Sequence, residues 1–211
     1  MLAIPSGLVA IPNDLSSADA APLLCAGLTT YNALRRSPAR TGDLVAVQGI
    51  GGLRHLGVQF AAHRGCRVAA IARGADKAAL AKQLGAHHHI DSKAGDPAAA
   101  LQALGGAQLI LATASDSKSM SALVGGLAPR GRMIVVGAGS DPIEVSPFDL
   151  LFGSRSIEGA LTGSAIDNED TLAFSVLENI RPMIETVPLE KAPEAFAKME
   201  RATKRDSAWS S

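Results

Sequence analysis

A glycine-rich turn is the segment of this 211-residue chain whose residue types point most clearly to chemistry. Gly49, Gly51, Gly52 and Leu53 directly follow the apolar run Leu44–Gln48 and open a helical pattern. In that context Gly49 allows a tight turn, Gly51 lets the backbone approach a pyrophosphate, and the helix N-terminus offers N–H groups to phosphate. These four residues therefore predict a dinucleotide-binding turn. A strand-to-helix turn that merely favours glycine is the alternative.

The third glycine of the dinucleotide-binding pattern is replaced here by Arg54. That glycine normally permits close packing between helix and strand. We expect the Arg54 side chain to point outwards or to push the helix away, because overpacking costs about 1–3 kcal/mol. The sequence thus predicts weak nucleotide binding that Arg54→Gly strengthens roughly tenfold.

The end of the next apolar run, Arg67–Ile71, bears on the choice of cofactor. Ala72 and Arg73 follow it, where an NAD site would place a carboxylate for the ribose hydroxyls. Without a carboxylate a 2′-phosphate is not repelled, and the guanidinium of Arg73 can bind it through paired hydrogen bonds. The sequence favours NADP over NAD. Arg73 as a solvated loop charge is the alternative.

Alternating strand and helix patterns surround these residues and predict the fold. They indicate an α/β, Rossmann-like, doubly wound fold whose six-stranded sheet is mostly parallel. We expect strands at residues 44–48, 67–71, 87–90, 108–112, 132–136 and 156–160. Residues 17–36 are expected to form one helix, or two with a break near Pro22, and further helices are expected at 52–64, 76–84, 97–104, 118–127, 169–179 and 190–201.

Four further residues fall at the carboxyl ends of predicted strands. Thr113 follows the fourth strand, and Val136, Gly137 and Ala138 lie at the end of the fifth. Ligands of open α/β sheets bind at these strand ends. We expect the four residues to contact the ribose and nicotinamide of the cofactor.

Composition and charge exclude several classes of protein. Lys and Arg number 20, as do Asp and Glu, so no basic excess favours a nucleic acid or an anionic membrane. No apolar stretch reaches the roughly 18 residues of a membrane-spanning helix. The first residues lack the pattern of a signal peptide. The two cysteines, Cys25 and Cys66, lie far apart in the sequence, and we expect a reducing, cytoplasmic location.

Several motifs together resemble the zinc-dependent alcohol dehydrogenases of the medium-chain superfamily. They are residues 20–31, the glycine turn with the following His55-Leu56-Gly57, and residues 82–86, 131–137 and 156–159. The resemblance implies hydride transfer between NAD(P) and an alcohol or aldehyde. It also implies a catalytic zinc with three protein ligands, of which Cys25 matches the third, and a lysine, matched by Lys77, beside the adenosine ribose or phosphate.

The likeness runs from about Leu2 to Met199 and covers mainly the family's cofactor domain. We expect residues 16–165 to form that dinucleotide-binding domain. Residues 1–15 resemble a remnant of the catalytic domain, and residues 166–211 resemble C-terminal helices and a frayed remnant. The family's other two zinc ligands and its proton relay match nothing here. We therefore expect a chain truncated at both ends and inactive alone, and assign no catalytic residue.

The sequence leaves two alternative functions open and also predicts a homodimer. If the chain is not a zinc dehydrogenase, it is either a non-catalytic NAD(P)-binding module or a zinc-independent enzyme like the quinone reductases of the same superfamily. The family often pairs subunits through the last strand of the cofactor domain. That resemblance implies a homodimer through the edge near residues 156–160.

Overall fold

Six parallel strands in the order β3-β2-β1-β4-β5-β6 form the sheet that carries the glycine turn. The structure is a computed structural model that describes residues 7–137 and 139–206. The predicted Rossmann-like α/β fold is confirmed, with every strand pair parallel. The strands are β1 (Leu44–Gln48), β2 (Arg67–Ala72), β3 (His88–Asp91), β4 (Ala107–Ala112), β5 (Leu127–Val135) and β6 (Ser156–Gly159).

The strand that leads into the glycine turn lies at the centre of the sheet. All five residues of β1 are buried, and β2 and β4 flank it with Val45 opposite both Val68 and Leu109. A continuous apolar run of this kind is typical of a strand covered on both faces. The prediction that Leu44–Gln48 is a parallel, non-edge strand is confirmed.

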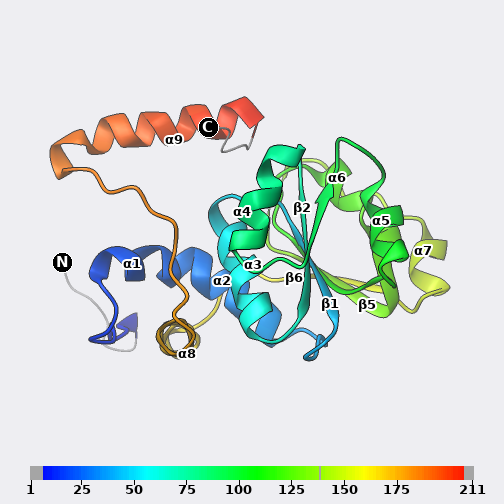
Figure 1. Cartoon of the computed structure of the whole chain (residues 1–211), viewed down its shortest axis with the longest axis horizontal. Helices are drawn as coiled ribbons and strands as arrows, with labels where there is room; N and C mark the ends of the chain where they lie inside the picture. Colours follow the sequence, from blue (N-terminus) through cyan, green and yellow to red (C-terminus); the bar gives the residue numbers. More distant parts are fainter. Residues whose placement is uncertain (1–6, 138, 207–211) are drawn as a thin grey trace.

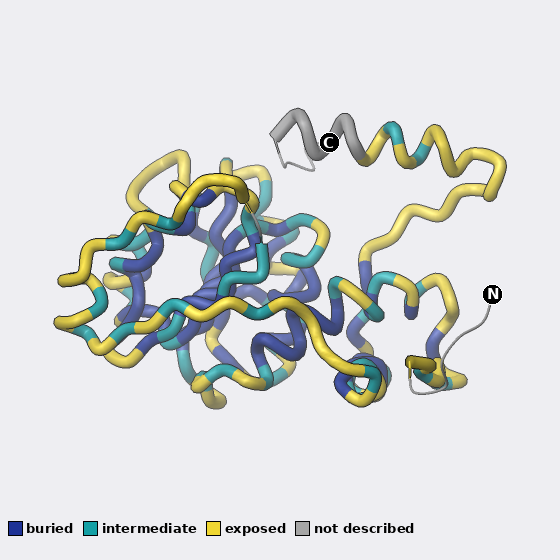
Figure 2. The backbone as a smooth tube through the Cα atoms, turned by 180° about the vertical axis from the view of Figure 1, so that it is seen from behind, coloured by how far each residue is buried: buried dark blue, intermediate teal, exposed yellow. Residues whose placement is uncertain are grey.

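Helices cover both faces of the sheet (Figures 1 and 2). Alternate side chains of β1 are buried in two separate cores. Val45 and Val47 pack with Phe60 of the helix that follows the glycine turn. Ala46 packs with Leu101 on the opposite face. The helices are α1 (Ser17–Pro22), α2 (Leu28–Arg35), α3 (Gly52–His63), α4 (Ala78–Gln83), α5 (Pro97–Ala103), α6 (Ser117–Ser121), α7 (Pro147–Leu151), α8 (Ala165–Leu177) and α9 (Ala192–Asp206).

The structure defines the extent of two expected helical segments. Residues 17–36 form two helices with a break near Pro22, which was one of the two arrangements expected: a π-helical turn, Leu23–Gly27, joins α1 to α2. The expected helix 118–127 ends at Ser121, and Leu127 already begins β5. Glycines break it: Gly126 packs so closely on α5 that an added Cβ would lie 2.7 Å from Leu101 Cδ1.

One short helix, α7, which lies between β5 and β6, was not predicted from the sequence. Ser146 accepts a hydrogen bond from the Phe148 N–H, and Pro147 occupies the first helical position. Serine followed by proline is a recognised helix-start signal that could have revealed it.

The last helix, α9, lies apart from the sheet and is exposed over most of its described part (Figures 1 and 2). Across the described residues, no helix is both long enough and apolar enough to cross a bilayer.

Candidate cofactor site

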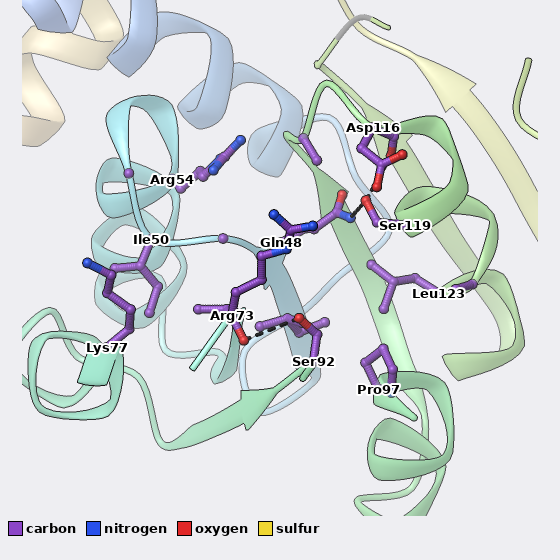
Figure 3. Close-up of a pocket in the computed structure, with 16 residues that line it drawn as sticks. Gln48, Ile50, Arg54, Arg73, Lys77, Ser92, Pro97, Asp116, Ser119 and Leu123 are labelled. Carbon is purple, nitrogen blue, oxygen red and sulfur yellow. Dashed lines mark hydrogen bonds between the residues drawn. The ribbon is translucent and has the colours of Figure 1, made fainter. Parts of the chain in front are cut away.

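A cavity of about 440 Å³ opens at the carboxyl ends of β1 and β2 (Figure 3). β1 has β2 on one side and β4 on the other, so the strand order reverses here, as at the ligand site of other doubly wound sheets. Four predicted cofactor residues line it: Gly49, Gly51, Arg73 and Lys77. Gln48, Ile50, Arg54, Ile71, Ala72, Ser92, Pro97, Ala114, Asp116, Ser119, Ala122 and Leu123 complete the lining.

The glycine turn has the backbone geometry that its sequence predicts. Gly49 has a φ of +94°, a conformation that residues with a Cβ rarely adopt, and its N–H donates to Ile71 O at 2.5 Å. Gly51 is the extended N-cap residue of α3, with Gly52 and Leu53 in the first helical turn. A Cβ added at Gly52 would meet no atom within 4 Å, so this turn faces open space. Gly52 and Leu53 do not line the cavity itself.

Arg54 does not lie where the sequence predicts. Its side chain runs back over the turn, and a Cβ added at Gly49 would lie 2.4 Å from Arg54 Cδ. Arg54 Nε donates to Thr113 Oγ1 at 3.1 Å. Desolvation by burial lowers the pKa of this guanidinium from its usual value, although an arginine stays charged at neutral pH.

The close approach of helix and strand is made one turn further along α3, at Gly57. A Cβ added there would lie 3.0 Å from Leu111 Cδ2 and 3.4 Å from Val47 Cγ1. Arg54 therefore neither points outwards nor pushes the helix away, and the expectation from its bulk was wrong. A small residue three positions after Arg54, on the same helical face, was the signal that could have shown this.

The far end of the cavity, at β2, carries positive charge. Arg73 follows β2 and extends across the pocket, and Lys77 lies nearby, 3.7 Å from Asp76 Oδ2 (Figure 3). The neighbouring carboxylate, Asp91, faces the backbone instead: its Oδ1 accepts from the N–H groups of Gly74 and Lys93 at 2.7 and 2.8 Å. Those two hydrogen bonds hold the pKa of Asp91 below its usual value.

A buried amide in the wall of the cavity lacks a partner for its oxygen. Gln48 is 6% exposed, and its Nε2 donates to Ser119 Oγ at 2.9 Å. Within the described part of the chain, Gln48 Oε1 accepts no hydrogen bond. A buried acceptor of this kind favours a ligand that brings an N–H or O–H group. Together with the cations and the glycine turn, it fits the adenosine phosphate portion of a dinucleotide.

Three predicted nicotinamide-side residues stand outside the cavity. Thr113, Val136 and Gly137 do not line it, although Thr113 contacts Arg54. The backbone at Gly137 lies against the end of β4, where an added Cβ would be 2.0 Å from Ala114 O. The predicted contact Ala138 lies outside the described residues.

The described residues do not form a three-ligand zinc site. Cys25 lies in the π-helical turn as an exposed free thiol. Among residues 7–137 and 139–206 as described, no three His, Cys, Asp or Glu residues gather closely enough to hold a metal ion. A catalytic zinc needs three protein ligands, so these residues alone do not fit it.

Comparison with known proteins places this site in a family. The profile of zinc-binding dehydrogenases matches residues 52–178. The chain belongs to the zinc-binding dehydrogenase family. It is 43% identical over 197 residues to an alcohol dehydrogenase from Penicillium expansum, and 36% identical over 199 residues to one from Geobacillus stearothermophilus. The alignments cover 93% of this chain but only 58% and 59% of those two relatives.

Solved structures of dehydrogenases share the fold. A cinnamyl alcohol dehydrogenase from Sorghum bicolor superposes with a TM-score of 0.81 at 31% identity, covering 92% of this chain and 55% of that one. A CAD from Helicobacter pylori complexed with NADP(H) gives 0.76 at 28% identity, covering 92% and 55%. The resemblance to zinc-type alcohol dehydrogenases is thus confirmed, and this family member spans little more than half of its relatives' length.

Proposed function

We propose that this chain is the cofactor-binding part of an NAD(P)-dependent dehydrogenase acting on alcohols or aldehydes. The observation that carries the proposal is the cationic, glycine-edged cavity at the reversal of strand order. The relatives named as alcohol dehydrogenases support this class of substrate. When bound, the nicotinamide would accept or supply the hydride.

Each side chain or turn of the cavity would bind one portion of the cofactor. The turn at Gly49, Gly51, Gly52 and Leu53 would receive the pyrophosphate on backbone N–H groups at the start of α3. Arg73 and Lys77 would bind the 2′-phosphate and ribose of NADP. Gln48 Oε1 would accept from an N–H or O–H group of the adenosine.

The nicotinamide portion would extend to the ends of β4 and β5. Thr113, Val136, Gly137 and Ala138 are the residues proposed to contact it in a complete dehydrogenase. In this family a zinc would polarise the substrate oxygen, with Cys25 at one ligand position. Because the described residues offer no three-ligand cluster, we expect this chain alone to oxidise no alcohol.

The lack of a three-ligand metal cluster among the described residues favours a second function: a nucleotide-binding module without chemistry of its own. For the isolated chain both functions predict cofactor binding without turnover. An assay with simple alcohols, NADP and added zinc tests this shared expectation, and turnover would contradict it because it requires a complete zinc site.

We further propose the domain limits and assembly expected from the sequence. Residues 16–165 would form the cofactor domain, with 1–15 and 166–211 belonging to the catalytic part. A homodimer would pair the exposed edge of β6. Both cysteines are free thiols, which supports a reducing compartment such as the cytoplasm.

The proposed function is tested by calorimetric titration of the chain with NADP and with NAD. Saturable binding with one site per chain, tighter for NADP, is the expected result. Absence of heat with both cofactors at millimolar concentration would refute it.

A further inference from the structure

A hydrogen-bonded bridge closes the crevice between β1 and β4. Thr113 Oγ1 donates to Gln48 O at 2.6 Å and accepts from Arg54 Nε at 3.1 Å, while Arg54 Nη2 donates to Thr113 O at 3.4 Å. Gln48 ends β1 and Thr113 follows β4. The guanidinium of Arg54 is therefore held by the carboxyl end of β4, beside the end of β1.

The stem of the same side chain covers the first glycine of the turn. A Cβ added at Gly49 would lie 2.4 Å from Arg54 Cδ and 2.8 Å from Nε. A glycine at position 54 would leave this volume open. Arg54 thus fills space directly above the turn that a cofactor must cross.

The direction in which a dinucleotide crosses the sheet makes the position of the Arg54 side chain important for cofactor binding. The adenosine ribose of a dinucleotide lies at the end of the second strand of such folds. β2 and β4 lie on opposite sides of β1, so the remainder of the cofactor must pass over Gly49 towards β4. Arg54 lies on that path.

The lining of the cavity is consistent with Arg54 lying on the path of the cofactor. It reaches Arg73 and Lys77 at the end of β2 and Ala114 just after β4, but its lining does not include Thr113, Val136 or Gly137. At Gly137 the chain also lies directly on Ala114. Of the residues proposed to bind the cofactor, the cavity thus includes those on the adenosine side and none of the three on the nicotinamide side.

We infer that Arg54 excludes the nicotinamide half of the cofactor, so that this pocket selects 2′-phosphorylated adenosine phosphates and gains almost nothing from the nicotinamide end. The inference rests on the proposed function, because it assumes that the cavity binds the adenosine half. The ligand class is an adenosine bisphosphate, with Arg73 and Lys77 as its cationic partners.

Calorimetric titration of adenosine 2′,5′-bisphosphate and of NADP into the same protein tests the inference. In the unaltered chain the two affinities should agree within about threefold. Arg54→Ala should tighten NADP binding by about tenfold and change bisphosphate binding by less than about twofold. Arg54→Gly should do the same. Arg64→Ala, which removes an equal charge at the other end of α3, should change neither affinity.

Four results would overturn the inference, and one of them would also refute the proposed function. NADP binding tenfold tighter than bisphosphate in the unaltered chain would show an open nicotinamide half. Loss of affinity for both ligands in Arg54→Ala would show that the guanidinium binds a shared phosphate. No binding of the bisphosphate at all would refute the proposed function as well, whereas normal bisphosphate binding with an unchanged ratio in both Arg54 variants refutes only the role of Arg54.

Discussion

At the scale of single residues, we propose that Ala72 sets the preference of the end of β2 for NADP over NAD. This position closes β2 beside Arg73 and carries no carboxylate. Ala72→Asp would restore an acceptor for the ribose hydroxyls and repel a 2′-phosphate. We expect NADP binding to weaken by about tenfold and NAD binding to tighten, reversing the preference. Calorimetry with both cofactors measures this, and equal affinities unchanged by the substitution would contradict it.

His55 gives a second residue-scale prediction, on stability. This buried imidazole donates from Nδ1 to Gly52 O and accepts from the Met183 N–H at 2.9 Å through Nε2. Burial lowers the pKa of His55. The pKa of His55 in the folded protein thus lies below its unfolded value of about 6.5. The contribution of neutral His55 to the free energy of unfolding is therefore complete above about pH 6.5 and is lost as the pH falls towards the folded pKa.

Urea unfolding between pH 8 and pH 5 checks the sign. The free energy of unfolding should decline below about pH 6.5. His55→Gln, which does not titrate, should show a smaller decline over the same range. An equal decline in both proteins would mean that other groups cause it.

The sequence predicted the conformational role of Gly49 from its type and its place after β1. It could not predict where Arg54 points, because that depends on Thr113, distant in sequence but adjacent across the sheet. The unpaired oxygen of Gln48 was hidden for the same reason: its neighbour Ser119 lies 71 positions away.

At the scale of elements, the packing of α3 on the sheet depends on Gly57. An added side chain would meet Leu111 and Val47, both deep in the core beneath the helix. We expect Gly57→Leu to lower the free energy of unfolding by about 1–3 kcal/mol or more through overpacking. Denaturant unfolding measures the loss. Gly52→Ala on the same helix, where nothing lies within 4 Å, is the control and should change stability little. Equal effects would contradict the packing account.

Five of the strands were predicted to within one residue at each end, whereas the strand expected at 132–136 begins earlier, at Leu127. Leu44–Gln48 was placed correctly because a buried run between turn residues has few alternatives. The helix expected at 118–127 was too long, since the contact of Gly126 with α5 is tertiary and leaves no local pattern.

At the scale of the whole molecule, the open edge of the sheet predicts self-association. β6 pairs only with β5 among the described strands, which leaves its outer side available for another strand. We expect a two-fold dimer of 21.6 kDa chains. Light scattering over a range of concentrations gives the mass. A monomer at high protein concentration would contradict the prediction.

Among the residues of the cavity beside β2, Arg73 is the one on which NADP binding is expected to depend most. Titration of NADP into Arg73→Ala tests it directly, with Arg67→Ala as the matched control, since Arg67 lies at the opposite end of β2 and donates to Leu104 O. We expect Arg73→Ala to weaken NADP binding by about tenfold or more, as for a lost charged hydrogen bond. Arg67→Ala should bind like the unaltered chain. Equal NADP affinity in all three proteins would contradict the account.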